Sequence, residues 1–267
     1  MTKRSPLSLK TSIGGVIEIR GILGAAVENL GTRIVGGEWR EGETVSKEAD
    51  LVDELGVSRS VVREAFRILG AKGLIRSRTS DGTRVQPRTE WRLLDPDVMD
   101  WRIKAGDTAN LLRDLLKVRL VMEPGIARAA TEMANAKQRQ RLEAAWWRKV
   151  EVKEDTKSDP LTKRNNFIEA DLDFHKALIE CVDSELLEQL YAVIEAALSL
   201  LIDLQMEAAG YVREMVGMEE SHELHFAVYK AFMAGDADKA FTAMHALIEA
   251  GIADAQKGLS IRASRTK

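Results

Sequence analysis

Hydrophobic residues between positions 46 and 86 follow a helical period twice and then change to alternation. The first stretch contains Ala49, Leu51, Val52 and Leu55, and the second contains Val61, Val62, Ala65, Phe66 and Leu69. Each stretch follows a serine, Ser46 or Ser58, whose hydroxyl can accept a hydrogen bond from the first helical turn. Gly56 lies between them and permits a sharp reversal of the backbone. The pattern predicts a helix-turn-helix.

An alternating pattern follows the second of these helices. Residues 74–78 and 83–86 flank Ser80-Asp81-Gly82, a turn of the Asp-Gly type that is typical of hairpins. Pro87 cannot donate a backbone hydrogen bond and therefore ends the second strand. A hairpin directly after a helix-turn-helix is typical of a winged helix, which we assign to residues 1–88.

A linker with one short helix is predicted over residues 89–107. Asp95 can cap this helix, because its carboxylate can accept from the free N–H groups of the first turn, and a proline suits the next position. Gly106 ends the helix. Trp91 and Trp101 are expected to pack between the two domains.

The rest of the chain, 108–258, shows only helical periodicity, and a short tail covers 259–267. Breaks in the pattern predict six helices, at 108–134, 137–156, 161–182, 185–209, 211–234 and 236–257. Long helices with short connections favour an antiparallel all-α bundle, with Pro124 kinking the first helix. The fold class is therefore mainly α: a winged helix-turn-helix with a small hairpin, followed by a helical bundle.

Composition limits the classes of protein that remain. Hydrophobic residues make up 45% and charged residues 30%, which is typical of a folded globular protein. A single cysteine, Cys181, fits a reducing compartment. The apolar stretch near the N-terminus contains Glu18, Arg20 and Glu28 and is too interrupted for a signal peptide or a membrane helix. We expect a cytoplasmic protein that does not enter a membrane.

Charge is distributed unevenly on this chain, whose net charge is −3. Residues 56–88 hold 8 basic residues against 2 acidic ones, which favours an anionic polymer as partner, although a solvated basic face is the alternative. Arg59, Arg63 and Arg67 recur every four residues and form one stripe of the second predicted helix. Such a stripe suits the major groove of DNA. Glu64 offers another interpretation, because it could pair with Arg67 or Arg63.

The motif Leu-Gly-Val-Ser-Arg-Ser-Val-Val-Arg-Glu-Ala-Phe at 55–66, with Gly73-Leu74-Ile75 and the Gly82-x-x-Val85 hairpin, resembles the GntR family of regulators over roughly 30–88. The resemblance implies DNA contacts from Arg59 and Arg63. It also implies that Ser58, Ser60 and Gly82 approach the DNA backbone. Lys47 on the preceding helix would contact at most a phosphate, and Arg67 completes the set of candidates.

Four polar side chains in the bundle are candidates for a small-molecule or metal site. Asp171 and His175 are four residues apart and share a helix face, a spacing that can chelate a divalent ion. His225 lies on a later helix, with His222 one turn before it. The spacing alone is common in helices, so surface polar residues are the alternative interpretation.

The order of these residues is similar to the FCD effector domain of the FadR branch of the GntR family. That resemblance implies a metal ion such as Zn²⁺, one per subunit, held by Asp171, His175, His225 and a fourth histidine. The fourth position is Leu247 here. His245, two residues away, would point from another helix face. His222 is a candidate substitute ligand.

The resemblance also suggests how an effector would bind. Arg119 falls where the family commonly keeps an arginine facing the effector, which is usually a carboxylate, and a guanidinium can hold a carboxylate through two hydrogen bonds. A salt bridge to Glu123 is the alternative role of Arg119. The Leu-Asp-Pro-Asp-Val segment of the linker is similar to galactonate-responsive members of the family and points to a sugar acid. Arg119, Asp171, His175 and His225 are thus the predicted effector-binding residues.

We interpret the chain as a homodimeric, cytoplasmic transcriptional repressor that is not an enzyme. It would leave its operator DNA when a carboxylate or sugar-acid effector binds. Two other classes stay open: a metal-dependent enzyme that uses the Asp/His group, and an architectural DNA-binding protein without an effector. Activation in place of repression also stays open, because the sign of regulation depends on operator position.

Overall fold

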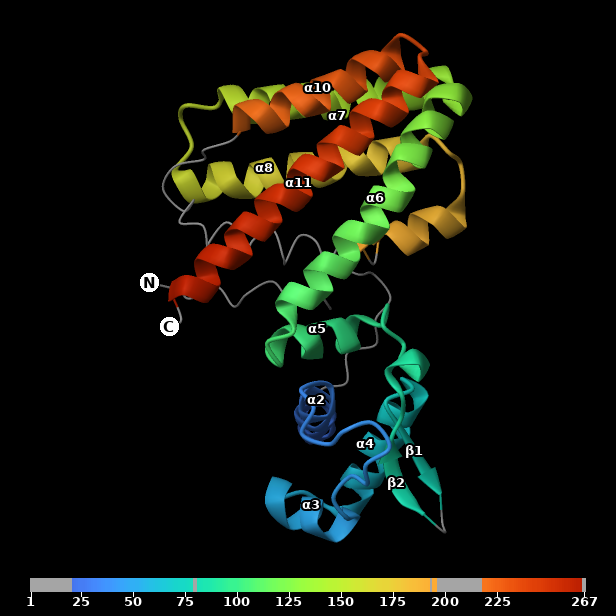
Figure 1. Ribbon diagram of the computed structural model, residues 1–267, viewed down its shortest axis with the longest axis vertical. Helices are drawn as coiled ribbons and strands as arrows, with labels where there is room; N and C mark the ends of the chain where they lie inside the picture. Colours follow the sequence, from blue (N-terminus) through green and yellow to red (C-terminus); the bar gives the residue numbers. More distant parts are fainter. Residues whose placement is uncertain (1–20, 79–80, 193, 196–217, 266–267) are drawn as a thin grey trace. The chain divides into compact units, whose positions relative to one another are not determined.

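The structure, a computed structural model, describes residues 21–78, 81–192, 194–195 and 218–265 (Figure 1). The chain divides into two compact units, Met1–Leu111 and Leu112–Lys267. The predicted fold class is confirmed: the described residues are mostly helical, and the strands among them form one antiparallel pair.

The N-terminal unit contains a helix-turn-helix, a hairpin and two further helices. Its elements are α2 (Gly21–Val35), α3 (Glu48–Leu55), α4 (Arg59–Ala71), β1 (Ile75–Arg78), β2 (Gly82–Val85), a 3₁₀ turn (Arg88–Glu90) and α5 (Pro96–Lys104). Helix α2 packs against α4 and α5, and α3 packs against α4. This packing buries one continuous apolar core.

The turn between α3 and α4 forms as its residues predict. Gly56 has a left-handed backbone (φ 63°), and the Ser58 hydroxyl caps α4 by accepting from the backbone N–H of Val61. The prediction that Ser46 caps α3 is wrong. The capping position is Lys47, and no side chain caps the helix there. Glu48 and Asp50 in the first turn of α3 instead stabilise the helix by interacting with the positive end of its dipole.

The hairpin has the predicted turn, but β1 begins one residue later than expected, and β2 begins and ends one residue earlier than expected. Ile75 pairs with Val85 and Arg78 with Gly82. The predicted turn residue Ser80 lies outside the described residues. An earlier segment of the chain extends the sheet, because the N–H of Val45 donates to the carbonyl of Thr83 at 2.8 Å.

Helix α2 was not predicted from the sequence. Its apolar residues Ala26, Val27, Leu30 and Ile34 recur at three- and four-residue intervals, and all four are buried. Their spacing is the signal that could have identified the helix.

Trp91 and Trp101 belong to the core of the N-terminal unit, so the prediction that they pack between domains is wrong. The Trp101 ring lies against α2 at Gly31, where a Cβ atom would come within 2.5 Å of the ring. The Trp91 indole N–H donates to the carbonyl of Gln86 at 2.9 Å. The ring of Trp101 packs into the space left by the missing side chain of Gly31. This packing buries more of its apolar surface than an exposed position in a linker would.

Ion pairs also hold helix α5 against the winged helix. Lys72 at the end of α4 lies 2.7 Å from Asp95 and 2.9 Å from Asp97. Asp95 caps the helix and Pro96 occupies its first turn, as predicted. The expected stop is also found, because α5 ends at Lys104 and Gly106 has φ 84°.

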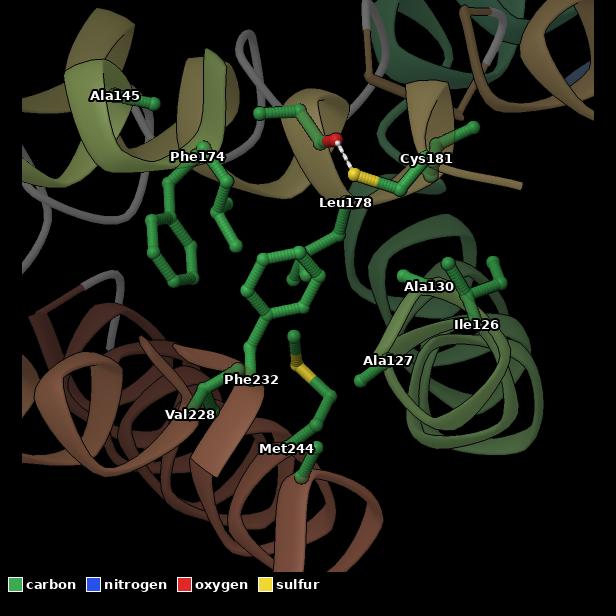
Figure 2. Packing of buried hydrophobic residues seen from close by; sticks show 14 of the residues in the cluster. Ile126, Ala127, Ala130, Ala145, Phe174, Leu178, Cys181, Val228, Phe232 and Met244 are labelled. Carbon is green, nitrogen blue, oxygen red and sulfur yellow. Dashed lines mark hydrogen bonds between the residues drawn. The ribbon is translucent and has the colours of Figure 1, made fainter. Parts of the chain in front are cut away.

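The C-terminal unit is a bundle of long helices. Its named elements are α6 (Thr108–Met133), which starts within the N-terminal unit, α7 (Ala136–Glu154), α8 (Pro160–Glu180), α10 (Met218–Met233) and α11 (Ala237–Arg265). Helix α7 packs against α8 and α10, and α10 packs against α11. Phe174, Leu178, Phe232 and Met244 meet in the apolar core (Figure 2). None of the helices in the described ranges is long and apolar enough to cross a membrane.

The first three predicted bundle helices agree with α6, α7 and α8 to within two residues at each end. The predicted helix at 185–209 and the start of the one at 211–234 lie mostly outside the described residues, although 185–192 are helical. The last helix does not stop at 257. It continues to Arg265, so most of the predicted tail is helical. A single glycine at 258 costs a helix only about 1 kcal/mol and does not end one.

Replacing Gly31 by alanine is expected to destabilise the N-terminal unit, by about 1–3 kcal/mol, because the new methyl group overlaps the Trp101 ring. Gly125→Ala is the matched control. Gly125 is also helical, has nothing within 4 Å of an added Cβ, and should be neutral or stabilising by up to about 1 kcal/mol. Denaturant unfolding followed by circular dichroism measures both. Equal stability of the Gly31→Ala variant and the wild type would refute the packing of Trp101 on α2.

Candidate functional site

A group of three buried or half-buried polar side chains lies inside the C-terminal unit. Asp171 and His175 come from successive turns of α8, and His225 comes from α10. One ligand atom from each lies within 4.8 Å of the others. The structure therefore brings together the three residues that the sequence singled out.

Each histidine of the group is held through its Nδ1 atom. The Nδ1 atom of His175 lies 2.7 Å from a carboxylate oxygen of Glu123, and that of His225 lies 2.7 Å from the carbonyl oxygen of Ser221. Both partners are acceptors, so Nδ1 carries the proton and Nε2 presents a lone pair. Carboxylates and carbonyls orient metal-binding histidines in this way.

The Nε2 atom of His225 faces Asp171. It lies 3.0 Å from Oδ1 of this carboxylate, yet within the described part of the chain Nε2 makes no hydrogen bond of good geometry. With the proton on Nδ1, two acceptors face each other at this distance and repel. A cation between them would remove the repulsion, so the residues fit a divalent ion such as Zn²⁺.

Two cationic side chains border the group. The ammonium of Lys149, on α7, lies 2.7 Å from Asp171 Oδ1. The Arg119 guanidinium, on α6, donates two hydrogen bonds to Glu123 and lies 3.1 Å from Nε2 of His175. The salt bridge considered for Arg119 is present, and its guanidinium also lies beside the candidate site.

These neighbours set the protonation states of the group. Burial raises the pKa of Glu123, but Arg119 and His175 outweigh it and lower that pKa to about 2. Burial also raises the pKa of Asp171, and Lys149 with His225 outweighs it and holds this pKa well below its usual value. For His225, burial and then Lys149 lower the pKa to about 4, although Asp171 opposes them. At neutral pH Asp171 and the neighbouring Glu123 are therefore ionised and His225 is neutral, which is the ligand form of an imidazole.

The remaining candidates lie elsewhere. His222 is not in the group; its ring packs on Trp146 with the ring centroids 4.7 Å apart. His245 is directed to Glu249, with 3.2 Å between Nδ1 and the carboxylate, as its position on another helix face predicts. Leu247, at the fourth ligand position of the family, is buried in the apolar core.

Sequence reasoning missed two participants in this site. Lys149 is buried, and it shares a helix face with Leu142, Ala145 and Val152, a spacing that could have indicated its position. The Tyr191 hydroxyl donates to Glu123 at 3.4 Å. No signal in the sequence indicated that contact, because it depends on how separate helices meet.

The basic stripe of α4 is exposed in the N-terminal unit. Arg63 lies 2.9 Å from Glu48 of α3, and Arg67 lies 2.7 Å from Glu64, which is one of the pairings considered above. Arg59 is exposed and has no carboxylate partner among the described residues. Ser58 and Ser60, at the start of the helix, share a hydrogen bond of 2.8 Å between their hydroxyls.

The hairpin adds further exposed cations. Arg84 pairs with Asp81 at 2.7 Å, whereas Arg76 and Arg78 are exposed without an ion pair in the portion of the chain described. In the sequence these two arginines contribute to the local positive charge, and no separate role is predicted for them. Gly82 has φ 74° at the turn, and Lys47 is exposed just before α3.

Two family models match the chain. Residues 24–85 match the gntR family of bacterial regulatory proteins, and residues 114–250 match the FCD domain. The two matches fall on the winged helix and on the helical bundle.

Several characterised proteins are similar over most of their length. The galactonate operon transcriptional repressor of Escherichia coli K12 is 31% identical over 218 residues, covering 80% of this chain and 88% of the repressor. The transcriptional repressor NanR of Cronobacter sakazakii is 27% identical, covering 78% and 75%. The solved structure of Lar, which controls expression of the Listeria monocytogenes agr system, has a TM-score of 0.55 at 16% identity. It covers 90% of this chain and 99% of Lar, so the two share a fold.

The winged helix, the helical bundle and the similar proteins all indicate the same family. The protein belongs to the GntR family of bacterial transcriptional regulators, with an N-terminal DNA-binding domain and a C-terminal FCD effector domain.

Proposed function

We propose that the protein is a homodimeric cytoplasmic repressor of an operon for the breakdown of a sugar acid or a related carboxylate. The observation that carries this proposal is the buried group of Asp171, His175 and His225 with Arg119 and Lys149 beside it. Cationic side chains next to possible metal ligands suit a small anion that also carries hydroxyl groups. Similarity to the galactonate operon repressor makes galactonate the first effector to test.

In this proposal, residues 1–88 bind the operator. Arg59 and Arg63 at the start of α4 would reach base edges or phosphates, with Glu48 holding Arg63 in position. Arg76 and Arg78 of the hairpin supply further charge for phosphates. The contacts proposed for the DNA backbone come from Lys47, Ser58, Ser60 and Gly82, and Arg67 is the last candidate.

Residues 108–258 would bind the effector and form the dimer. Asp171, His175 and His225 would hold one divalent ion per subunit, which would supply a Lewis-acidic centre for oxygen ligands when bound. Glu123 fixes Arg119 beside His175, where the guanidinium can reach a carboxylate. Repression would end because the effector binds the DNA-competent and released arrangements with different affinity.

A catalytic use of the Asp/His group is the less favoured hypothesis. The similar proteins named above are transcriptional regulators, and the group is bordered by the cationic side chains of Arg119 and Lys149, which suit an anionic ligand. His225 is oriented to donate a lone pair and does not offer a proton toward Asp171. These features support binding as the role of the site.

Arg59→Ala is expected to weaken operator binding by about 1–3 kcal/mol, because this exposed arginine lacks a carboxylate partner among the described residues. Arg67→Ala serves as its comparison and should cost less, because Glu64 already neutralises that side chain. Fluorescence anisotropy with a selected operator, over a series of salt concentrations, measures both. Wild-type affinity in the Arg59→Ala variant would show that α4 is not the recognition helix.

The operator should be an inverted repeat, since a two-fold dimer presents two identical recognition helices. Footprinting on DNA selected from random sequence tests this, and sedimentation of the complex counts the subunits. A single unrepeated site bound by one subunit would contradict the dimer.

The purified protein is expected to contain a divalent metal, and Leu247→His should increase its affinity if position 247 borders the same site. Elemental analysis, followed by calorimetric titration of galactonate before and after chelator treatment, measures metal content and its effect. The Asp/His group does not bind metal if the native protein contains none and chelation leaves effector affinity unchanged. The three residues would then hydrogen-bond the effector directly.

A further inference from the structure

Lys149 has an unusual position for a lysine. Its side chain is 3% exposed, and its ammonium lies 2.7 Å from Oδ1 of Asp171 and 5.2 Å from the centre of the Phe167 ring. Asp171 is the carboxylate it contacts within the described residues. The same oxygen lies 3.0 Å from Nε2 of His225.

The ammonium and a metal ion bound beside His225 would therefore share the Asp171 carboxylate, whose other oxygen, Oδ2, lies 3.9 Å from Nε2 of His175. A carboxylate oxygen that accepts from Lys149 has less electron density to donate, and the positive charge of Lys149 repels a second cation in a buried site. Burial strengthens this effect, because little water screens the two charges. Metal binding at Asp171 is opposed as long as Lys149 stays on Oδ1.

Arg119 differs from Lys149 in this respect. It also contacts a possible ligand, Nε2 of His175, but Glu123 neutralises its charge through two hydrogen bonds. Within the described part of the chain, Lys149 has no second carboxylate that could take the place of Asp171. Its four-carbon side chain is flexible and its ammonium can rotate toward a different acceptor.

We propose that Lys149 competes with the divalent metal ion for Asp171 and thereby lowers the metal affinity of the site until an anionic ligand attracts the ammonium. This inference rests on the proposed metal-binding function. Lys149 is a positioning residue that couples the binding of the metal ion to the binding of the anion. When the anion binds the ammonium of Lys149, Asp171 becomes available to the metal. By reciprocity, the metal favours the anion.

Titration of the full-length protein with Co²⁺, followed by its visible absorption and then by Zn²⁺ competition, tests this proposal. Lys149→Met is expected to bind Co²⁺ at least about tenfold more tightly than the wild type, since the competing charge is gone. Lys149→Arg keeps the charge and should bind no more tightly than the wild type. Lys153→Met is the matched control: it removes a lysine one turn further along α7 that pairs with Glu219 at 2.7 Å, so metal affinity should be unchanged.

Thermal unfolding gives a second measurement. Removal of Lys149 leaves the Asp171 carboxylate buried without its cation, so the variant should melt lower than the wild type without metal. Added Zn²⁺ should then raise its melting temperature more than that of the wild type. Lys149→Gln keeps a hydrogen-bond donor without the charge and should show the same gain in metal affinity if the methionine variant does not fold.

The outcomes separate this inference from the function on which it rests. If the wild type and the uncharged Lys149 variants bind Co²⁺ with equal affinity, the competition is refuted and the metal site remains. If Lys153→Met gains the same affinity for Co²⁺ as the Lys149 variants, the gain comes from the lower overall positive charge, and the competition is again refuted. If no variant binds Co²⁺ or Zn²⁺, the metal site itself is refuted and the competition with it.

Discussion

Ionised carboxylates buried among apolar helices are costly unless cations are buried with them, and the organisation of the C-terminal unit depends on this constraint. Glu123 and Asp171 lie where water cannot solvate them fully, and Arg119 and Lys149 compensate their charge. The Lys149–Asp171 pair joins α7 to α8, the Arg119–Glu123 pair lies within α6, and the contact of His175 with Glu123 connects α6 to α8. His175 contacts Glu123 and His225 contacts Asp171, and the His225 ring is uncharged at neutral pH.

The same constraint connects stability with ligand binding in this domain. A carboxylate whose partner is a protein cation can exchange that partner for a ligand, and the fold then loses one interaction as it gains another. Such a site is less stable than an apolar core of equal volume. In the proposed function, this exchange would let the arrangement of the helices respond to what is bound.

Much of the fold could be predicted from the sequence because local rules determine it. Gly56, Ser58 and Asp95 act through their own backbone neighbours, and each was placed correctly. The trio of Asp171, His175 and His225 could be predicted from helical spacing together with a family resemblance. The spacing of Lys149 with Leu142, Ala145 and Val152 could have indicated its burial, but its contact with Asp171 could not be predicted, since that depends on how α7 packs on α8. The placement of the two linker tryptophans failed for a similar reason: the cavity that accepts Trp101 is created by a glycine seventy residues earlier.

The attachment of α5 to the winged helix has a consequence for protein engineering. Trp101 against Gly31, together with Lys72 between Asp95 and Asp97, makes residues up to Lys104 part of the DNA-binding fold. A chimera that fuses this DNA-binding domain to the effector domain of another protein should therefore be joined near Gly106. A junction at the end of the hairpin would expose the pocket in which Trp101 is buried and leave the ammonium of Lys72 without its carboxylates.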